Sequence, residues 1–412
     1  MNAINLQFGD VREKSISTLN QFVSHMVEHI AWRLGVKIQL VWETENWKLL
    51  GVQLGKEIKK FTPAQRQGVA LGMIDDGSAE VMIDLDKKGL KLTSVENINL
   101  SWFLNMRCEQ LDSGKPLTAL LEGLTEGLNA EIEIKICSFE DPHHTWEAVF
   151  RGVGIALNKI FTSQTSIKIV DGDSKLTQQI SNAGDLVVKE STVNKAMVYR
   201  KTAETLIKIG VDFARAKKNK ISIDVDKSIN MENLDELLAL ITRKGGFALD
   251  VNFKAKVLSS SHVVWEDVGL VLGRALLEIM KIRMEKVGIN GAGSNLKRPA
   301  DIKNQAIKIG LSVEGRKFLR IFPAALDYQD IRKKLLLGKS ILGNLRSEDL
   351  DDFLDGLCGG MGCSLIVIVN RLQKPEDFWK NIFSGIGDAL NEVFLANPYR
   401  KGVPPGVKAN LS

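Results

Sequence analysis

Hydrophobic positions along this chain follow two alternating patterns, which together predict a mixed fold of strands and helices. Four short apolar or period-two segments are typical of strands, at residues 37–42, 131–136, 247–257 and 364–369. Each is followed by a polar link and by a helical pattern that begins near a tryptophan. Two further helical patterns, 17–35 and 230–246, precede strands and end in glycine, which commonly terminates a helix. A strand-then-helix motif therefore recurs, with two helices expected on each sheet.

The tryptophans at the start of these helices reveal an internal repeat. Four of the seven are followed by small and apolar residues at fixed offsets: Trp47, Trp146, Trp265 and Trp379. The first and third share glycines four and eight residues later, whereas the second and fourth share a phenylalanine and two differently spaced glycines. This A-B-A-B order indicates two homologous units of two half-units each. We expect the first unit at 1–170, a polar, glycine-containing linker at 171–195, and the second unit at 196–412.

Composition agrees with a folded protein and excludes several functions. With 412 residues and 44% hydrophobic content the chain can build real cores, and its formal charge of +5 is spread too evenly for a nucleic-acid surface. No apolar run approaches the roughly 20 residues of a membrane span. The similar segments FLNMRC and FLDGLC place Cys108 and Cys358 at equivalent repeat positions. We therefore expect buried thiols without disulfides, and a cytoplasmic protein.

Candidate chemistry is concentrated in the second repeat. His143 and His144 precede Glu147 by four and three residues, so all three side chains can point to one side of a helix start. Imidazole nitrogens with a carboxylate suit manganese, iron, zinc or nickel. In the third repeat His262 and Glu266 take the positions of His143 and Glu147.

The other two repeats lack this pattern. They have Thr44, Glu45 and Lys48, and Glu376, Asp377 and Lys380, at the corresponding positions. A lysine in place of the carboxylate would repel a metal cation. Hydrogen-bonding or solvated roles for the individual histidines and charged residues remain the alternative.

These motifs resemble the imidazoleglycerol-phosphate dehydratase family over nearly all of both units. The A and B repeats are similar to the family's two His-His-x-x-Glu segments. RKTAETLIKIGVDF (200–213) looks like its opening strand, and RQGVALGMIDDGSAEVMIDL (66–85) follows the family in the first unit. GINGAGSN (288–295) and SVEGRKF (312–318) resemble its phosphate-site segments, and VPPGVKANL (403–411) resembles its closing loop.

The resemblance implies a fold and an activity. The fold is α+β, with tandem units of two half-domains, each a four-stranded sheet with two helices on one face (ribosomal protein S5 domain 2-like). The activity is that of a manganese-dependent carbon–oxygen lyase, a dehydratase that acts on a phosphorylated imidazole in histidine biosynthesis. The partners implied are this small substrate and further copies of the chain in a homo-oligomer, with no nucleic acid and no membrane.

The resemblance also implies site residues. Glu204 and His25 are the catalytic candidates. The substrate phosphate would be held by Arg66, Arg316, Lys168 and Lys408. The metal, Mn²⁺ or another divalent ion, would be held by His25, His143, His144, Glu147, His262 and Glu266. Of the five histidines, only His29 falls outside the family's ligand positions.

Departures from the family keep other functions open. The first unit lacks the opening strand with its glutamate, Glu236 replaces the second unit's counterpart of His25, and Glu133 stands where a strand histidine is expected. Neither unit alone has the complete ligand set, so the units could share one composite site. The alternatives are a catalytically degenerate paralogue with a scaffold or ligand-sensing role, and a related lyase with a different substrate.

Overall fold

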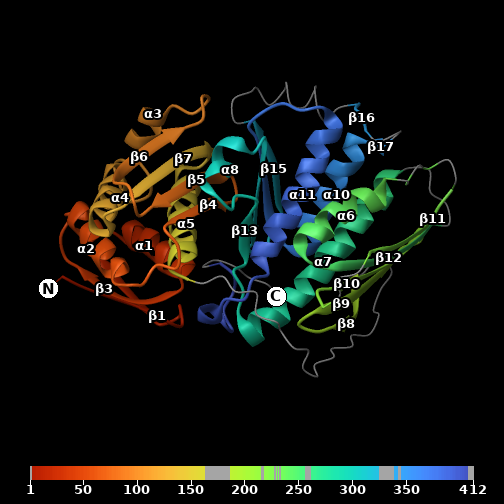
Figure 1. Ribbon diagram of the computed structural model, residues 1–412, viewed down its shortest axis with the longest axis horizontal. Coiled ribbons are helices and arrows are strands. Elements are labelled where there is room, and N and C mark those ends of the chain that lie inside the picture. The colour runs from red at the N-terminus through yellow and green to blue at the C-terminus, as the bar shows by residue number, and fades with distance from the viewer. Residues whose placement is uncertain are drawn as a thin grey trace. The chain divides into compact units, whose positions relative to one another are not determined.

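The computed structural model describes residues 2–162, 186–214, 218–226, 229, 231, 233–255, 261–323, 338–341 and 345–406 (Figure 1). Contacts divide the chain into two compact units. Unit 1 comprises Met1–Thr165, Leu296–Gln305 and Asn397–Val403. Unit 2 comprises Ser166–Asn295, Ala306–Ala396 and Pro404–Ser412. Among the described residues, no helix is both long enough and apolar enough to cross a membrane.

The first half of unit 1 is a three-stranded sheet with two helices. Its elements are β1 (Ala3–Phe8), β2 (Lys14–Thr18), α1 (Gln21–Leu34), β3 (Val36–Trp42) and α2 (Trp47–Lys59). The strand order is β1-β3-β2, with β1 antiparallel and β2 parallel to the central strand. Alternate residues of β3 are buried, with α1 packed on β3 and α2 on β1, as a half-covered sheet requires.

The second half of unit 1 is a four-stranded sheet. Its elements are β4 (Gln67–Ile74), β5 (Gly77–Asp84), β6 (Gly89–Ser94), α3 (Leu100–Asn105), α4 (Lys115–Leu128), β7 (Glu131–Ser138) and α5 (Pro142–Phe161). The strand order is β4-β5-β7-β6, and α5 packs on β4 and β5. Since α1 packs on α5 and α2 on α4, the helices of the two halves form the middle of the unit, and its core runs continuously between the two sheets.

Unit 2 repeats this plan. Its first half contains β8 (Leu186–Ser191), β9 (Lys195–Lys201), β10 (Thr205–Asp212), β11 (Lys220–Asp224), α6 (Leu234–Gly245), β12 (Ala248–Ala255) and α7 (Ser261–Val287). Its second half contains β13 (Ala292–Ser294), β14 (Ile307–Val313), β15 (Phe318–Pro323), β16 (Ser340–Ile341), β17 (Leu345–Arg346), α10 (Ser347–Met361), β18 (Cys363–Val369) and α11 (Pro375–Val393). The main sheets have the orders β11-β12-β10-β9-β8 and β13-β14-β18-β15. Here α6 packs on α11 and α7 on α10.

Glycines let these helix pairs approach closely. A Cβ atom at Gly51 would lie 2.1 Å from the Leu120 carbonyl oxygen, and one at Gly269 would lie 2.2 Å from the Phe353 carbonyl oxygen. The glycines that revealed the repeat are therefore the points where α2 crosses α4 and α7 crosses α10. The short helix α8 (Pro299–Asn304) and the turn η2 (Pro398–Arg400) belong to unit 1 although they come late in the chain.

The predicted α+β duplication is confirmed, and several details need correction. The main sheets have three, four, five and four strands, rather than four each. Residues 200–213 form no single strand: β9 and β10 pair as a hairpin whose turn includes Glu204. Residues 186–191, placed in the linker, form strand β8 paired with β9.

The cysteine equivalence is also wrong. Cys358 lies within α10, whereas Cys108 lies in the loop after α3 and pairs by backbone with Leu111. The true counterpart of α10 is α4. Helix α4 packs on α2, which contains Trp47, and α10 packs on α7, which contains Trp265. All four cysteines are nevertheless free and buried, as expected.

Candidate metal centre

Two helices of unit 1 bring the candidate ligands together. Helix α1 starts where the Asn20 side chain accepts a hydrogen bond from the Val23 amide, and it ends at Gly35, whose φ of 90° is left-handed. Helix α5 is capped by Asp141, whose side chain accepts from the His143 amide. A Cβ atom at Gly154 would lie 2.8 Å from the Ile30 carbonyl oxygen and 3.1 Å from that of His29, so the two helices touch beside His29 and two turns after Glu147.

Three imidazoles converge on one carboxylate oxygen. Glu147 Oε1 lies 2.6 Å from His25 Nε2, 3.0 Å from His143 Nε2 and 3.3 Å from His29 Nε2. The two α1 imidazoles are 3.2 Å apart through their Nε2 atoms. Because His25 and His29 are one helical turn apart, as are His143 and Glu147, each helix presents a pair of ligands on one face. We call these four residues the unit 1 cluster.

Outer carboxylates orient two of the rings. His25 Nδ1 lies 3.2 Å from Glu28 Oε2, and His143 Nδ1 lies 2.7 Å from Glu109 Oε1. In metal sites a ligating histidine usually directs its second ring nitrogen to a carboxylate or carbonyl, which fixes the ring and its tautomer. Both rings therefore turn Nε2 toward Glu147 in the manner of metal ligands.

Burial and hydrogen bonding set the charges of the cluster. Burial lowers the pKa of His29 to about 3, so its ring is neutral at neutral pH and has an available lone pair. Burial opposes ionisation of Glu147, but hydrogen bonds from His143, His25 and His29 outweigh it and hold the pKa of that carboxyl well below its usual range. Neutral imidazole and ionised carboxylate are the forms that bind metals.

The cluster fits a divalent cation. Ligand atoms of His25, His29 and Glu147 all lie within 4.8 Å of one another, and no other group of three or more such ligands meets this spacing in the described part of the chain. His29 Nδ1 is buried without a hydrogen-bond partner among the described residues. The side chains of His29 and Glu147 are fully buried, whereas those of His25 and His143 are 21% and 23% exposed. The cluster is therefore open on one side, as a catalytic metal site must be.

His29 was missed by the sequence analysis because it matches no ligand position of the family. The available signal was its spacing of four residues from His25. The structure directs His144 elsewhere: its Nδ1 lies 2.6 Å from Asp76 Oδ1, and its Nε2 lies 3.7 Å from Asp75 Oδ2. His144 is thus next to the cluster in sequence, while its ring is held by the β4–β5 turn.

Other predicted residues lie outside the cluster. In unit 1, Arg66 is exposed and donates to Asp86 Oδ1 over 2.7 Å. In unit 2, His262 and Glu266 lie near the start of α7, Glu204 is exposed in the β9–β10 turn, and Arg316 is exposed after β14. Lys168 and Lys408 lie outside the described residues.

His262 of unit 2 lies close to a carboxylate of α10. Burial raises the pKa of Asp352, and the charge of His262 opposes that rise. His262 lies on α7 and Asp352 on α10, and these two packed helices correspond to α2 and α4 of unit 1. In unit 1 the position of His262 is taken by Thr44, which has no imidazole.

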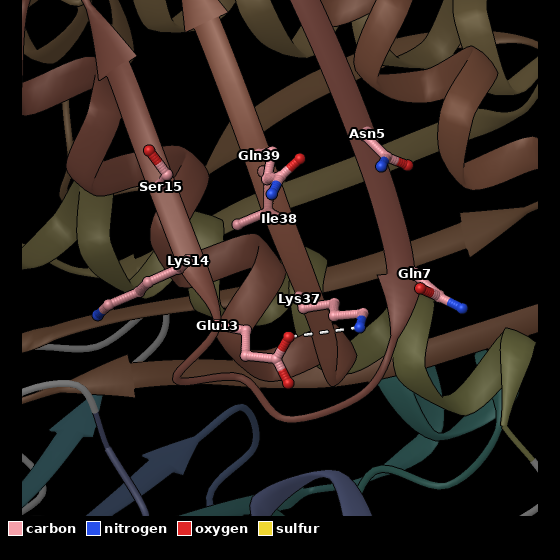
Figure 2. A pocket seen from close by; sticks show the side chains of 8 residues that line it. All are labelled: Asn5, Gln7, Glu13, Lys14, Ser15, Lys37, Ile38 and Gln39. Atoms are coloured by element: carbon pink, nitrogen blue, oxygen red, sulfur yellow. Dashed lines mark hydrogen bonds and ion pairs between the residues drawn. The ribbon is translucent and has the colours of Figure 1, made fainter.

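A separate pocket of about 340 Å³ lies on the sheet of β1, β3 and β2 (Figure 2). Apart from Ile38 its lining is polar, with Asn5, Gln7, Glu13, Lys14, Ser15, Lys37 and Gln39. Glu13 and Lys37 form an ion pair across it, with 3.4 Å between Oε2 and Nζ. None of the unit 1 cluster residues lines this pocket, so it is distinct from the candidate metal centre.

The fold and the cluster define a class: a duplicated α+β protein with a histidine–carboxylate site of metal-binding type in its first unit. The family model for imidazoleglycerol-phosphate dehydratase matches residues 15–157 and 230–390. The chain therefore belongs to the imidazoleglycerol-phosphate dehydratase family, and the two matched segments correspond to its two units.

Individual relatives each match about half of this chain. Imidazoleglycerol-phosphate dehydratase from Bacillus licheniformis is 31% identical over 213 residues, covering 52% of this chain and 97% of the relative. The protein of the same name from Streptococcus thermophilus is 27% identical over 211 residues, covering 51% and 96%.

Two solved structures of the enzyme are also similar to this chain. The Pyrococcus furiosus crystal structure is 25% identical and covers 41% of this chain and 97% of its own, with a TM-score of 0.33. The Staphylococcus aureus structure is 18% identical and covers 49% and 99%, with a TM-score of 0.35.

Proposed function

We propose that this chain is a metal-dependent hydro-lyase of the imidazoleglycerol-phosphate dehydratase type. It would remove water from a phosphorylated imidazole substrate in histidine biosynthesis, with Mn²⁺ held by the unit 1 cluster. The observation that carries the proposal is the convergence of three imidazole Nε2 atoms on Glu147 Oε1 within 2.6 to 3.3 Å, in a chain of this family.

The residues of the unit 1 cluster would have different roles. His29 and Glu147 form the buried floor of the cluster, while His25 and His143 stand at its open side. A divalent cation bound there would supply Lewis-acid chemistry, polarising the substrate and stabilising the charge left when a carbon-bound proton is removed. Glu28 holds His25 Nδ1 and leaves His25 Nε2 facing Glu147, so His25 would act there as a ligand of the cation and not as the group that takes up the proton.

Substrate contacts complete the proposal. Glu204 is proposed for substrate positioning or proton transfer, which its exposed place in a hairpin turn allows. Arg66, Arg316, Lys168 and Lys408 remain proposed phosphate contacts, since guanidinium and ammonium groups bind phosphate by charge-assisted hydrogen bonds. Arg66 would exchange its bond to Asp86 for one to the phosphate. Assembly into a homo-oligomer in the cytoplasm also remains part of the proposal.

The proposal is tested by dehydration assays with imidazoleglycerol phosphate and Mn²⁺. Glu147→Gln keeps the volume of the side chain but removes the charge that three imidazoles share, so turnover should fall at least about 100-fold. Glu126→Gln, an exposed partner of Lys48 in the same unit, is the control and should retain full activity. Equal activity of both variants, with circular dichroism unchanged, would remove the cluster from the mechanism.

A non-catalytic role is the second candidate. It is favoured by unit 2, where Lys380 occupies the repeat position of Glu147 and bonds to two carboxylates. A scaffold or sensor would bind metal or ligand without turnover, whereas a dehydratase would restore growth of a histidine auxotroph that lacks this step. A lyase with another substrate would fail to complement growth but would eliminate water from a related phosphorylated compound.

A further inference from the structure

The second unit repeats the helix crossing that builds the unit 1 cluster. A Cβ atom at Gly387 of α11 would lie 2.5 Å from the Ile241 carbonyl oxygen of α6, and one at Gly154 of α5 would lie 2.8 Å from the Ile30 carbonyl oxygen of α1. Seven residues before these glycines stand Lys380 and Glu147. The helix pairs α6–α11 and α1–α5 can therefore be compared position by position.

The helices that α11 and α5 cross, α6 and α1, also have corresponding residues at matching positions. Five residues before Ile241 stands Glu236, and five before Ile30 stands His25. On α11, Glu376 precedes Lys380 by four residues, as His143 precedes Glu147 on α5. Leu240 takes the place of His29.

The two units have the same arrangement of contacts at these positions, but the charges are reversed. Lys380 Nζ lies 2.9 Å from Glu236 Oε1 and 2.8 Å from Glu376 Oε1. In unit 1 the Glu147 oxygen takes the same central place between His25 and His143. Unit 2 thus has a cation between two carboxylates where unit 1 has a carboxylate between imidazoles.

We propose that the Lys380 ammonium is a built-in substitute for the metal ion of unit 2, so that each chain holds one divalent cation, in unit 1. This inference rests on the proposed metal role of the unit 1 cluster. An ammonium group donates up to three hydrogen bonds and satisfies both carboxylates without any ion. The hydrogen bond to Glu376 and the charge of Glu236 raise the pKa of Lys380, so the ammonium stays protonated at neutral pH.

The substitution also excludes a metal from this place. A divalent cation would have to displace the ammonium and would then face a like charge on the same helix face. Glu236 and Glu376 are 50% and 47% exposed, so the ion pairs contribute little to stability and can be changed without unfolding the unit. The position is therefore suited to a direct transplant of the unit 1 ligands.

The experiment transplants the unit 1 ligand set into unit 2. The four-substitution variant Glu236→His, Leu240→His, Glu376→His and Lys380→Glu reproduces His25, His29, His143 and Glu147 in order. Bound Mn²⁺ is counted by the loss of the free-ion electron paramagnetic resonance signal, in the full chain. We expect one ion per chain in the wild type and two in the variant, with Lys380→Arg as the control that keeps one.

The outcomes separate the two proposals. A folded four-substitution variant that binds no more Mn²⁺ than the wild type overturns the inference, as does a wild type that loses one of two ions when Glu236 becomes Gln. If the four changes unfold the chain, Lys380→Glu alone should bind a weaker second ion, and its failure to do so also overturns the inference. A wild type that binds no Mn²⁺ refutes the metal of unit 1, while a gain of one ion in the variant still supports the role of Lys380.

Discussion

His29 lies in an environment very different from that of a solvated side chain. It is fully buried, its Nε2 lies 3.2 Å from His25, and burial lowers its pKa to about 3 against an ordinary value of 6.5. Between these two values the unfolded chain binds a proton that the folded chain does not. The free energy of unfolding must therefore fall as pH falls below about 6.5.

This linkage gives a pH prediction for the metal-free protein. In EDTA, the His29 contribution should lower the free energy of unfolding by about 2 kcal/mol between pH 7 and pH 5. His29→Leu, which copies Leu240 of unit 2, should remove that contribution, whereas His262→Leu should leave it in place. Urea unfolding at a series of pH values measures it, and an equal slope in the wild type and in His29→Leu would contradict the account.

The sequence could predict most of the cluster but not all of it. His25, His143 and Glu147 were predicted to share a site, and the structure places them together. Repeat alignment could not find His29, because a contact between α1 and α5 spans 118 residues of sequence and depends on how the two helices cross. It also could not show that the β4–β5 turn supplies Asp76 to His144.

At the scale of single elements, the helices contain adjacent glycines with opposite roles. In α10, a Cβ atom at Gly360 would lie 2.0 Å from the Leu270 carbonyl oxygen, whereas one at Gly359 would be 3.6 Å from its nearest neighbour, the Lys317 side chain. Gly360 is therefore required by the crossing with α7, and Gly359 is not.

Alanine substitutions should separate these roles. Gly360→Ala must push α10 away from α7 and should destabilise the chain by about 1 to 3 kcal/mol or more. Gly359→Ala adds helix propensity at an exposed position and should stabilise the chain by up to about 1 kcal/mol. Thermal unfolding of both variants measures the difference, and equal midpoints would show that the crossing is not constrained by the glycine.

Element boundaries show why pattern alone predicts some features better than others. The ends of α1 and α6 could be predicted because Gly35 and Gly246 adopt left-handed φ values of 90° and 74°. The β9–β10 hairpin was missed because its turn at Thr202 and Glu204 lacks glycine and is held by hydrogen bonds to the Thr202 hydroxyl. The periodicity of hydrophobic residues along the sequence does not reveal hydrogen bonds of this kind, which a side chain makes to the backbone of its own turn.

At the scale of the whole molecule, unit 1 is completed by residues 397–403, a late segment of the chain that is flanked on both sides by residues of unit 2. The Arg400 guanidinium is 2% exposed and donates through Nε and Nη2 to the Trp32 carbonyl oxygen, over 3.2 and 2.7 Å. Tyr399 stacks on Phe8 with ring centroids 5.2 Å apart. Residues 397–403 therefore secure the C-terminal end of α1, the helix that carries His25 and His29.

This closing segment should contribute measurably to stability. Arg400→Met leaves the Trp32 carbonyl without its charged donor and should cost about 2 to 4 kcal/mol. Arg66→Met, which breaks an exposed ion pair of the same unit, should lower the free energy of unfolding far less, because solvent screens that pair. Urea unfolding compares the two, and equal losses would mean that the segment does not stabilise the unit.

The sequence alone could not predict that two late segments of the chain belong to unit 1. Repeat offsets define homologous segments, but they do not show that residues 296–305 and 397–403 pack with the first unit. Such packing depends on contacts such as Lys159 Nζ to the Val69 and Leu296 carbonyls, at 2.9 and 3.3 Å. In these contacts a buried lysine donates to backbone carbonyl groups. Every residue type has such a group, so the partner positions cannot be recognised in the sequence.

The central claim is that unit 1 holds a divalent metal between α1 and α5. It is tested most directly by anomalous X-ray diffraction at the manganese edge from crystals grown with Mn²⁺. We expect an anomalous peak in contact with His25 Nε2, His29 Nε2, His143 Nε2 and Glu147 Oε1. The absence of a peak there, or a peak instead at His144 with Asp75 and Asp76, would contradict it.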